Sequence, residues 1–191
     1  MQLRLRTSKK SVYVTLSVLL VYWFLLKKRR YTETFQVTID SVEPKTAWEY
    51  IADFSNQMKL NPTMEEFEIV YEKGNYALWE YSVTYKEHFA KIPFFHNDNT
   101  AIFRVTPEIR KGHYEPYRID SEHHTCILFY CLQTDAEITF EAGKDRQTTV
   151  MQERVTYECP PLLSPVCKLE LKTQKKLIYE KILAVDMNMP F

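Results

Sequence analysis

Few residues of this chain have the types and spacing that metal or covalent chemistry requires. His123 and His124 precede Cys126 and Cys131, and histidine and cysteine are common zinc ligands. These residues fall at an expected turn and strand start, without a second ligand pair at a recognisable spacing. We therefore interpret the two histidines as exposed turn residues, and we predict neither a metal site nor a cofactor.

Glu153 is the best candidate for acid–base chemistry, because it lies inside the strand expected over Thr148 to Cys159. It has the parity of Met151 and Val155, whose side chains should face the interior. Acid–base catalysis needs an ionisable group inside a pocket. A bulge that turns Glu153 outward is nevertheless the favoured interpretation, so Glu153 is only a weak catalytic candidate. The sequence has no G-x-S-x-G motif and no Cys–His signature, which leaves covalent catalysis without support.

The longest apolar segment, Ser11 to Leu26, is a run of 16 uncharged residues between two basic clusters. As a helix it reaches about 24 Å, slightly less than the ~27 to 30 Å of a bilayer's hydrocarbon core. A cleaved signal peptide would need small residues at its end, where Trp23 to Leu26 stand instead. The segment therefore predicts a single-pass membrane anchor between a basic tail (1–10) and a basic linker (27–31). A buried N-terminal helix is the remaining alternative.

The C-terminal end of this segment carries the residue types that favour a membrane interface. We expect the bilayer to be the partner of Tyr22, Trp23, Lys27, Lys28, Arg29 and Arg30. Four basic residues on each side leave the orientation open under the positive-inside rule. The domain after the anchor has no usable glycosylation sequon, because proline occupies the middle of Asn61-Pro62-Thr63. This favours a cytosolic domain on an endomembrane or the mitochondrial outer membrane.

Composition narrows the remaining classes of function. The chain has 25 basic and 25 acidic residues, so nucleic acid is an unfavoured partner, and the sequence names no protein partner. About 160 residues remain after the anchor, which is enough for one domain with one core. The four cysteines form no C-x-x-C pair, and we expect reduced, buried thiols. In a lumenal domain, Cys159 could instead bridge to Cys167 or Cys126.

The domain over residues 32–191 begins with a strand and two short helices. Phe35, Val37 and Ile39 alternate along the first strand, Thr34 to Ile39. Pro44 suits the first turn of one helix, and a second helix is expected over Ser55 to Leu60. Antiparallel strands then follow. The first begins at residue 64, and the others are expected over 77–86, 101–109, 114–120, 126–140 and 148–159, with a turn at Glu122-His123.

The chain is expected to end in a long helix from Ser164-Pro165 to about Val185. Its apolar stripe would cover the apolar face of the sheet, with Gln174 as a polar handle in the stripe. Basic residues would occupy the outer face of this helix: Lys168, Lys172, Lys175 and Lys181.

This order of elements resembles the α+β helix-grip fold shared by START domains, Bet v 1-like proteins and polyketide cyclase-like proteins (the SRPBCC superfamily). The local sequence agrees, since Phe35 to Ile39, Val42-Glu-Pro44, Trp48, Tyr50 to Phe54 and Asn61-Pro62 look like the opening of that superfamily. The resemblance covers roughly Thr32 to Val185. It implies a curved antiparallel sheet of about seven strands wrapped around the C-terminal helix.

The resemblance also implies an apolar cavity between sheet and helix that holds a lipid or another apolar small molecule. We therefore predict membrane-anchored binding or local transfer of such a ligand. Two alternatives stay open: a cyclase or hydrolase of an apolar substrate, and a scaffold module with a filled interior. The expected ligand-binding residues are Trp79, Tyr81, Tyr85, Phe103, Tyr117, Tyr130, Leu171, Gln174, Ile178 and Ile182.

Overall fold

The computed structural model describes residues 9–91, 94–109, 115–127, 130–144 and 148–187, with their side chains from Ser11 onward except that of Ile127. In these ranges, seven antiparallel strands form one sheet in the order β1-β7-β6-β5-β4-β3-β2. The strands are β1 (Arg29–Ile39), β2 (Met64–Asn75), β3 (Leu78–His88), β4 (His96–Thr106), β5 (Tyr117–Ile127), β6 (Tyr130–Ala142) and β7 (Thr149–Cys159). The helices are α1 (Lys9–Val21), η1 (Tyr22–Leu26), α2 (Pro44–Ala52), η2 (Phe54–Asn56), α3 (Gln57–Leu60), η3 (Pro161–Leu163) and α4 (Ser164–Ala184).

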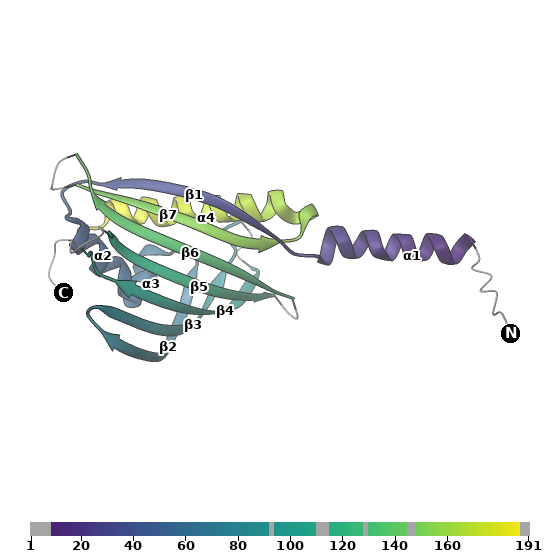
Figure 1. The fold of residues 1–191 in the computed structure, drawn as a ribbon, viewed down its shortest axis with the longest axis horizontal. Coiled ribbons are helices and arrows are strands. Elements are labelled where there is room, and N and C mark those ends of the chain that lie inside the picture. The colour runs from purple at the N-terminus through teal and green to yellow at the C-terminus, as the bar shows by residue number, and fades with distance from the viewer. Residues whose placement is uncertain (1–8, 92–93, 110–114, 128–129, 145–147, 188–191) are drawn as a thin grey trace.

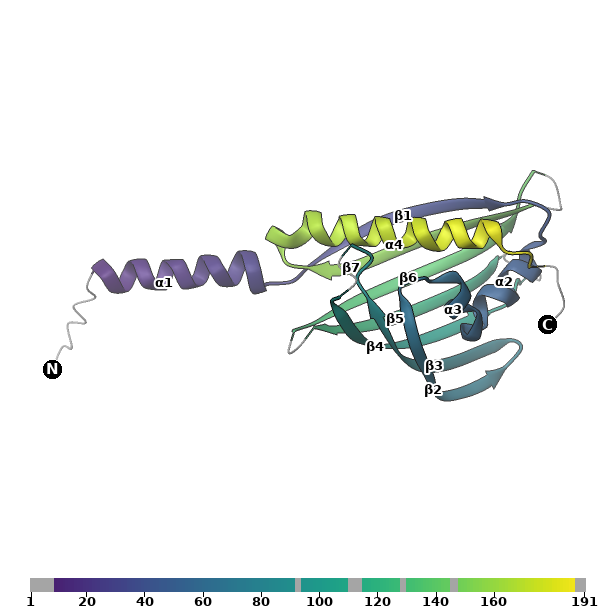
Figure 2. The same cartoon turned by 180° about the vertical axis from the view of Figure 1, so that it is seen from behind.

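The sheet curves around α4, while α2 and α3 cover the remaining part of its inner face (Figures 1 and 2). Alternation along the strands produces this arrangement, because inward positions such as those of β4 and β7 are buried and their neighbours are not. The expected helix-grip architecture is therefore confirmed.

The two ends of the sheet differ, and we name them by their distance from the N-terminal helix. At the proximal end lie His88, His96, Tyr130 and Cys159, together with the first turn of α4. At the distal end lie Ile39, Thr106, Tyr117, Ala142 and Thr149. The helices α1 and η1 project from the proximal end (Figure 1).

The expected turn at Glu122-His123 is wrong, because both residues lie within β5. The last residue of β5, Ile127, pairs with the first residue of β6, Tyr130. The polar run around His123 looked like a turn in the sequence, but it is a strand with polar side chains on both faces. The first strand is also longer than expected, since β1 pairs with β7 from Arg29 onward.

The N-terminal apolar segment is helical but lies apart from the core. Its α-helical part, α1, has 13 residues and gives way at Tyr22 to the π-helix η1. Side chains from Ser11 to Leu26 are exposed. Across the described ranges, none of the helices combines the length and hydropathy that crossing a bilayer requires, so the transmembrane helix expected over 11–26 is not supported. The basic linker is short, because β1 begins three residues after Leu26.

All four cysteines form disulfides, so the expectation of reduced thiols is wrong. Cys126 and Cys131 join facing positions of the β5–β6 hairpin, and Cys159 and Cys167 join the end of β7 to the first turn of α4. Both disulfides lie at the proximal end.

Candidate functional site

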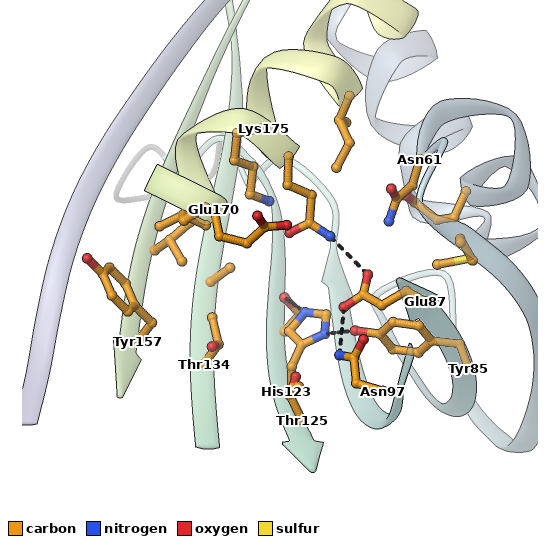
Figure 3. A pocket seen from close by; sticks show the side chains of 18 of the residues that line it. Asn61, Tyr85, Glu87, Asn97, His123, Thr125, Thr134, Tyr157, Glu170 and Lys175 are labelled. Atoms are coloured by element: carbon orange, nitrogen blue, oxygen red, sulfur yellow. Dashed lines mark hydrogen bonds between the residues drawn. The ribbon is translucent and has the colours of Figure 1, made fainter. Parts of the chain in front are cut away.

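A cavity of about 260 Å³ lies at the proximal end between the inner face of the sheet and α4 (Figure 3). Its position follows from the side chains that face inward along each strand. Towards the distal end these are large and apolar, and they fill the core: Val83, Val105, Ile119, Phe140 and Met151. Towards the proximal end they become smaller or polar: Glu87, Asn97, Ser121, His123, Thr134 and Glu153. The interior is therefore filled at one end and hollow at the other.

Glu153 faces this cavity and is almost completely buried, with 2% of its surface exposed. The expected bulge is wrong, because β7 keeps continuous register from Glu153 to Phe35 on one side and to Ile138 on the other. Lys175 Nζ lies 2.5 Å from Glu153 Oε1, so Lys175 turns inward rather than outward as expected. Tyr179 Oη donates to Glu153 Oε2 at 2.5 Å. Both oxygens of the Glu153 carboxyl are thus held by side chains of α4.

Glu87 is the second buried carboxyl of the cavity wall, and amide side chains surround it. Gln174 Nε2 donates to Oε2 at 2.9 Å, and Asn99 Nδ2 donates to Oε1 at 3.2 Å. Burial raises the pKa of Glu87, although hydrogen bonds from Asn97, Asn61 and Gln174 oppose this shift. Gln174 is therefore the polar handle that the sequence indicated, and it joins α4 to β3.

Tyr85 and His123 lie beside Glu87 on the inner face of the sheet (Figure 3), and together with Ser121 they form a hydrogen-bonded chain. Tyr85 Oη lies 2.9 Å from His123 Nδ1, and His123 Nε2 lies 2.9 Å from Ser121 Oγ. Burial, aided by the charge of Lys175, lowers the pKa of His123 to about 3. Burial also raises the pKa of Tyr85. Both side chains are consequently neutral near pH 7.

Half of the predicted ligand-binding residues line the cavity. These are Tyr85, Phe103, Leu171, Gln174 and Ile178. Four others pack in the core: Tyr81 donates to the Ala52 carbonyl, Trp79 contacts the Tyr81 ring, Tyr117 contacts Trp48, and Ile182 is 3% exposed.

Tyr130 lies at the tip of the β5–β6 hairpin, where its hydroxyl donates to the Leu26 carbonyl at 3.0 Å. It therefore joins η1 to the domain instead of lining the cavity.

Sequence reasoning missed His123 and misplaced Lys175. The parity of Ile119, Ser121 and His123 was the available signal, but the adjacent polar residues hid it by imitating a turn. No periodicity signal marks Lys175, because its inward orientation depends on Glu153 from a different element. Its neighbour Lys172 remains outside, as expected, near Glu33.

Comparisons with known proteins identify the fold. No protein-family model matches the sequence, and no curated protein is detectably similar. The structure is similar to the Zhui aromatase/cyclase from Streptomyces sp. R1128, with a TM-score of 0.60, 13% identity, and coverage of 83% of this chain and 93% of that chain. It is also similar to a START superfamily protein from Mycobacterium smegmatis (TM-score 0.54, 9% identity, 80% and 94% coverage).

A third similar structure is the di-domain ARO/CYC protein BexL of the BE-7585A biosynthetic pathway. The TM-score is 0.54 at 11% identity, with coverage of 95% of this chain and 57% of that one. At identities this low, the three likenesses show a shared fold alone and leave ligand and activity to the chemistry of the cavity.

The cavity has the chemistry of a binding site for a largely apolar molecule. Phe54, Phe103, Leu171 and Ile178 give it apolar walls, and the polar groups form hydrogen-bonded clusters within them. Pockets of this kind bind through apolar contact and orient the ligand through a few polar groups. Glu153 is already paired with Lys175, and Glu87 accepts hydrogen bonds from amide side chains.

Proposed function

We propose that this protein binds a lipid or another apolar small molecule in the proximal cavity and exchanges it with a nearby bilayer. The cavity of about 260 Å³ beneath α4 is the observation that carries this proposal. A scaffold module with no ligand would gain stability from filling that space, because unfilled volume lowers stability. Neighbours named as START and aromatase/cyclase proteins support an apolar guest.

The N-terminal helix supports attachment to a membrane. Its apolar side chains are exposed, among them Val14 at 64% and Leu19 at 56%, and water is an unfavourable environment for such a surface. At its C-terminal end, Lys27 Nζ lies 3.5 Å from the ring centroid of Trp23, and the Arg29 guanidinium lies 5.7 Å from it. An aromatic ring beside cations suits the headgroup region of an anionic bilayer.

The two disulfides indicate the kind of cellular compartment in which the domain lies. Disulfides persist in oxidising compartments and are rare in the cytosol. Pairing of all four cysteines therefore favours the lumen of an endomembrane or the cell exterior, opposite to the side that the missing sequon favoured. Thiol labelling of the protein in intact cells tests this. Blocked cysteines that become reactive only after reduction support the oxidising side, and cysteines that react at once place the domain in the cytosol.

An enzyme on the same scaffold is the second candidate. The chain of Tyr85, His123 and Ser121 is the observation that favours it, because a neutral imidazole between two hydroxyls can relay a proton. His123→Gln separates the two candidates once a ligand is known. Unchanged binding with lost turnover would indicate an enzyme, and absence of any turnover in the native protein would leave binding alone.

Two alanines on the inner face provide a direct test of the cavity. Ala136 lines the cavity and Ala101 lies in the filled core, and both are buried. We would titrate full-length protein in amphipol with the apolar probe 1-N-phenylnaphthylamine. Ala136→Leu should weaken saturable binding about tenfold or more, since the added carbons occupy ligand space. Ala101→Leu should leave binding intact in the fraction that folds. The proposal fails if native protein shows no saturable binding, or if folded Ala136→Leu binds as tightly as the native protein.

A further inference from the structure

A contiguous set of apolar side chains is exposed at the proximal end, on η3 and the first turns of α4. The exposed fractions are 60% for Leu162, 44% for Leu163, 61% for Val166 and 55% for Leu169. Single exposed apolar residues are ordinary on protein surfaces, whereas neighbouring ones mark interaction sites. These four side chains therefore indicate an interaction surface.

This segment is held in place rather than free to fold inward. The disulfide between Cys159 and Cys167 encloses η3 and ties the first turn of α4 to the end of β7. Pro161 and Pro165 further restrict the backbone here. The leucines consequently stay outside the core.

The same segment lies beside the N-terminal helix, because η3 contacts η1. Two contacts hold the end of η1 against the domain. Tyr130 donates to the Leu26 carbonyl, and Lys28 forms an ion pair with Glu158 at 3.4 Å. If η1 reaches a bilayer, Leu162 and Leu163 must come close to that bilayer too. The position of η3 relative to the membrane thus follows from that of Trp23.

A second exposed apolar pair lies at the same end, next to the cavity. Phe94 is 80% exposed and Phe95 is 40% exposed. Their strand neighbour Phe89 lines the cavity and donates its backbone N–H to the Phe95 carbonyl at 3.1 Å. Glu170 of α4, also in the lining, accepts the backbone N–H of Lys91 at 3.3 Å. The cavity therefore extends to the rim between α4 and the β3–β4 connection, where both apolar sets are exposed.

We propose that η3, the first two turns of α4 and the pair Phe94 and Phe95 form a second contact with the bilayer, separate from α1. Together with η1 this contact turns the rim between Phe89 and Glu170 towards the headgroups of an anionic leaflet. The inference deepens the proposed function, on which it rests for membrane attachment, by stating which end of the cavity exchanges the ligand. Apolar molecules would pass between leaflet and cavity without crossing water.

Quenching by brominated lipid tests the contact in the full-length chain. Native Trp48 and Trp79 lie in the distal core, so Trp23→Phe removes the tryptophan nearest the membrane. In that background, Leu163→Trp is compared with Leu183→Trp, which lies near the other end of α4 at 56% exposure. The probe is vesicles of phosphatidylcholine and phosphatidylserine with brominated phosphatidylcholine.

The emission of the tryptophan introduced by Leu163→Trp should shift to shorter wavelength and be mostly quenched by the brominated lipid. The emission of the tryptophan introduced by Leu183→Trp should not be quenched. Equal quenching at the two positions, or none at position 163, overturns the inference. Native protein separates this result from failure of the proposed attachment, because quenching of Trp23 reports η1 alone. Quenching of Trp23 without quenching at position 163 would keep membrane attachment and reject the second contact.

A charge at the same surface gives an independent measurement. Leu162→Glu with Val166→Glu should slow transfer of 1-N-phenylnaphthylamine from vesicles to protein several-fold, while binding at equilibrium stays unchanged. Leu183→Glu is the matched control and should transfer at the native rate. A native transfer rate in the doubly substituted protein contradicts the inference.

Discussion

The distal and proximal ends of this domain share one sheet but are stabilised differently. At the distal end, Phe140, Ile119 and Met151 are less than 3% exposed and fill the space beneath the strands. At the proximal end, a cavity replaces such packing, and ion pairs, hydrogen bonds and both disulfides join the elements around it. Alternating inward positions build a sheet face in both cases. Whether that face encloses a core or a hollow depends on the chemistry of the inward side chains.

The largest effect is expected from truncation in the filled end. Phe140→Ala should lower the free energy of unfolding by about 4 kcal/mol, because the removed ring leaves a void among close-packed neighbours. Leu171→Ala, which only enlarges an existing cavity, should cost less than about 2 kcal/mol. Urea denaturation of both variants measures the difference. Equal costs would show that the two ends are packed alike.

The proximal end should be more sensitive to a lost charge than to lost volume. Lys175→Met should cost about 3 kcal/mol, because the Glu153 carboxyl, which is 2% exposed, would lose its ion-pair partner. Adding Glu153→Leu to this variant should recover most of the loss, since the unpaired carboxyl is then gone. A double variant as unstable as the single one would argue against the buried pair as the cause.

The disulfide between Cys159 and Cys167 should make the next largest contribution to the free energy of unfolding. Replacing Cys159 and Cys167 by serine should lower stability by about 2.5 kcal/mol, the loop-closure value for residues eight positions apart. Hydrogen exchange should speed up at η3 and the first turn of α4 and stay unchanged in the distal strands. Uniform acceleration across the sheet would mean that the disulfide supports both ends.

Acid should weaken the proximal end through His123. Its pKa is about 3 in the folded chain and near 6.5 when unfolded, so the unfolded state binds an extra proton between these values. The contribution of His123 to the free energy of unfolding is thus fully present above pH 6.5. It falls as the pH drops, by about 2 kcal/mol between pH 7 and pH 5. His123→Gln should flatten this dependence. His124→Gln, an exposed neighbour, should leave it unchanged, and a flattened curve in that control would assign the effect elsewhere.

The sequence predicted the fold well because periodicity reports burial. The alternation of Tyr81, Val83 and Tyr85 marked a strand, and the helix expected from Ser164 to Val185 is observed as α4, ending at Ala184. The prediction of a turn at Glu122-His123 was wrong because a strand is recognised by its alternating hydrophobic residues. The strand β5 lines a polar hollow there, so that alternation is missing. The membrane-spanning helix was predicted from hydropathy, the flanking basic clusters and the missing cleavage site, but the helix observed there lacks the length and hydropathy that a span requires.

The site was less predictable than the fold, since its geometry depends on contacts between distant elements. Inward parity predicted that Tyr85 and Phe103 face the interior, where they line the cavity, but parity does not distinguish a lining residue from a core residue such as Tyr81. Glu153 was discounted because a lone carboxyl on an apolar face is costly. Its partners Lys175 and Tyr179 lie more than twenty residues away, and only the fold brings them together.

Native mass spectrometry of the full-length chain, kept in amphipol rather than in detergent, tests the binding proposal most directly. We expect one apolar molecule of defined mass to remain bound to the native protein and to Ala101→Leu, and to be missing from folded Ala136→Leu. A native protein that is empty, or one whose bound mass persists in Ala136→Leu, would contradict ligand binding in the proximal cavity.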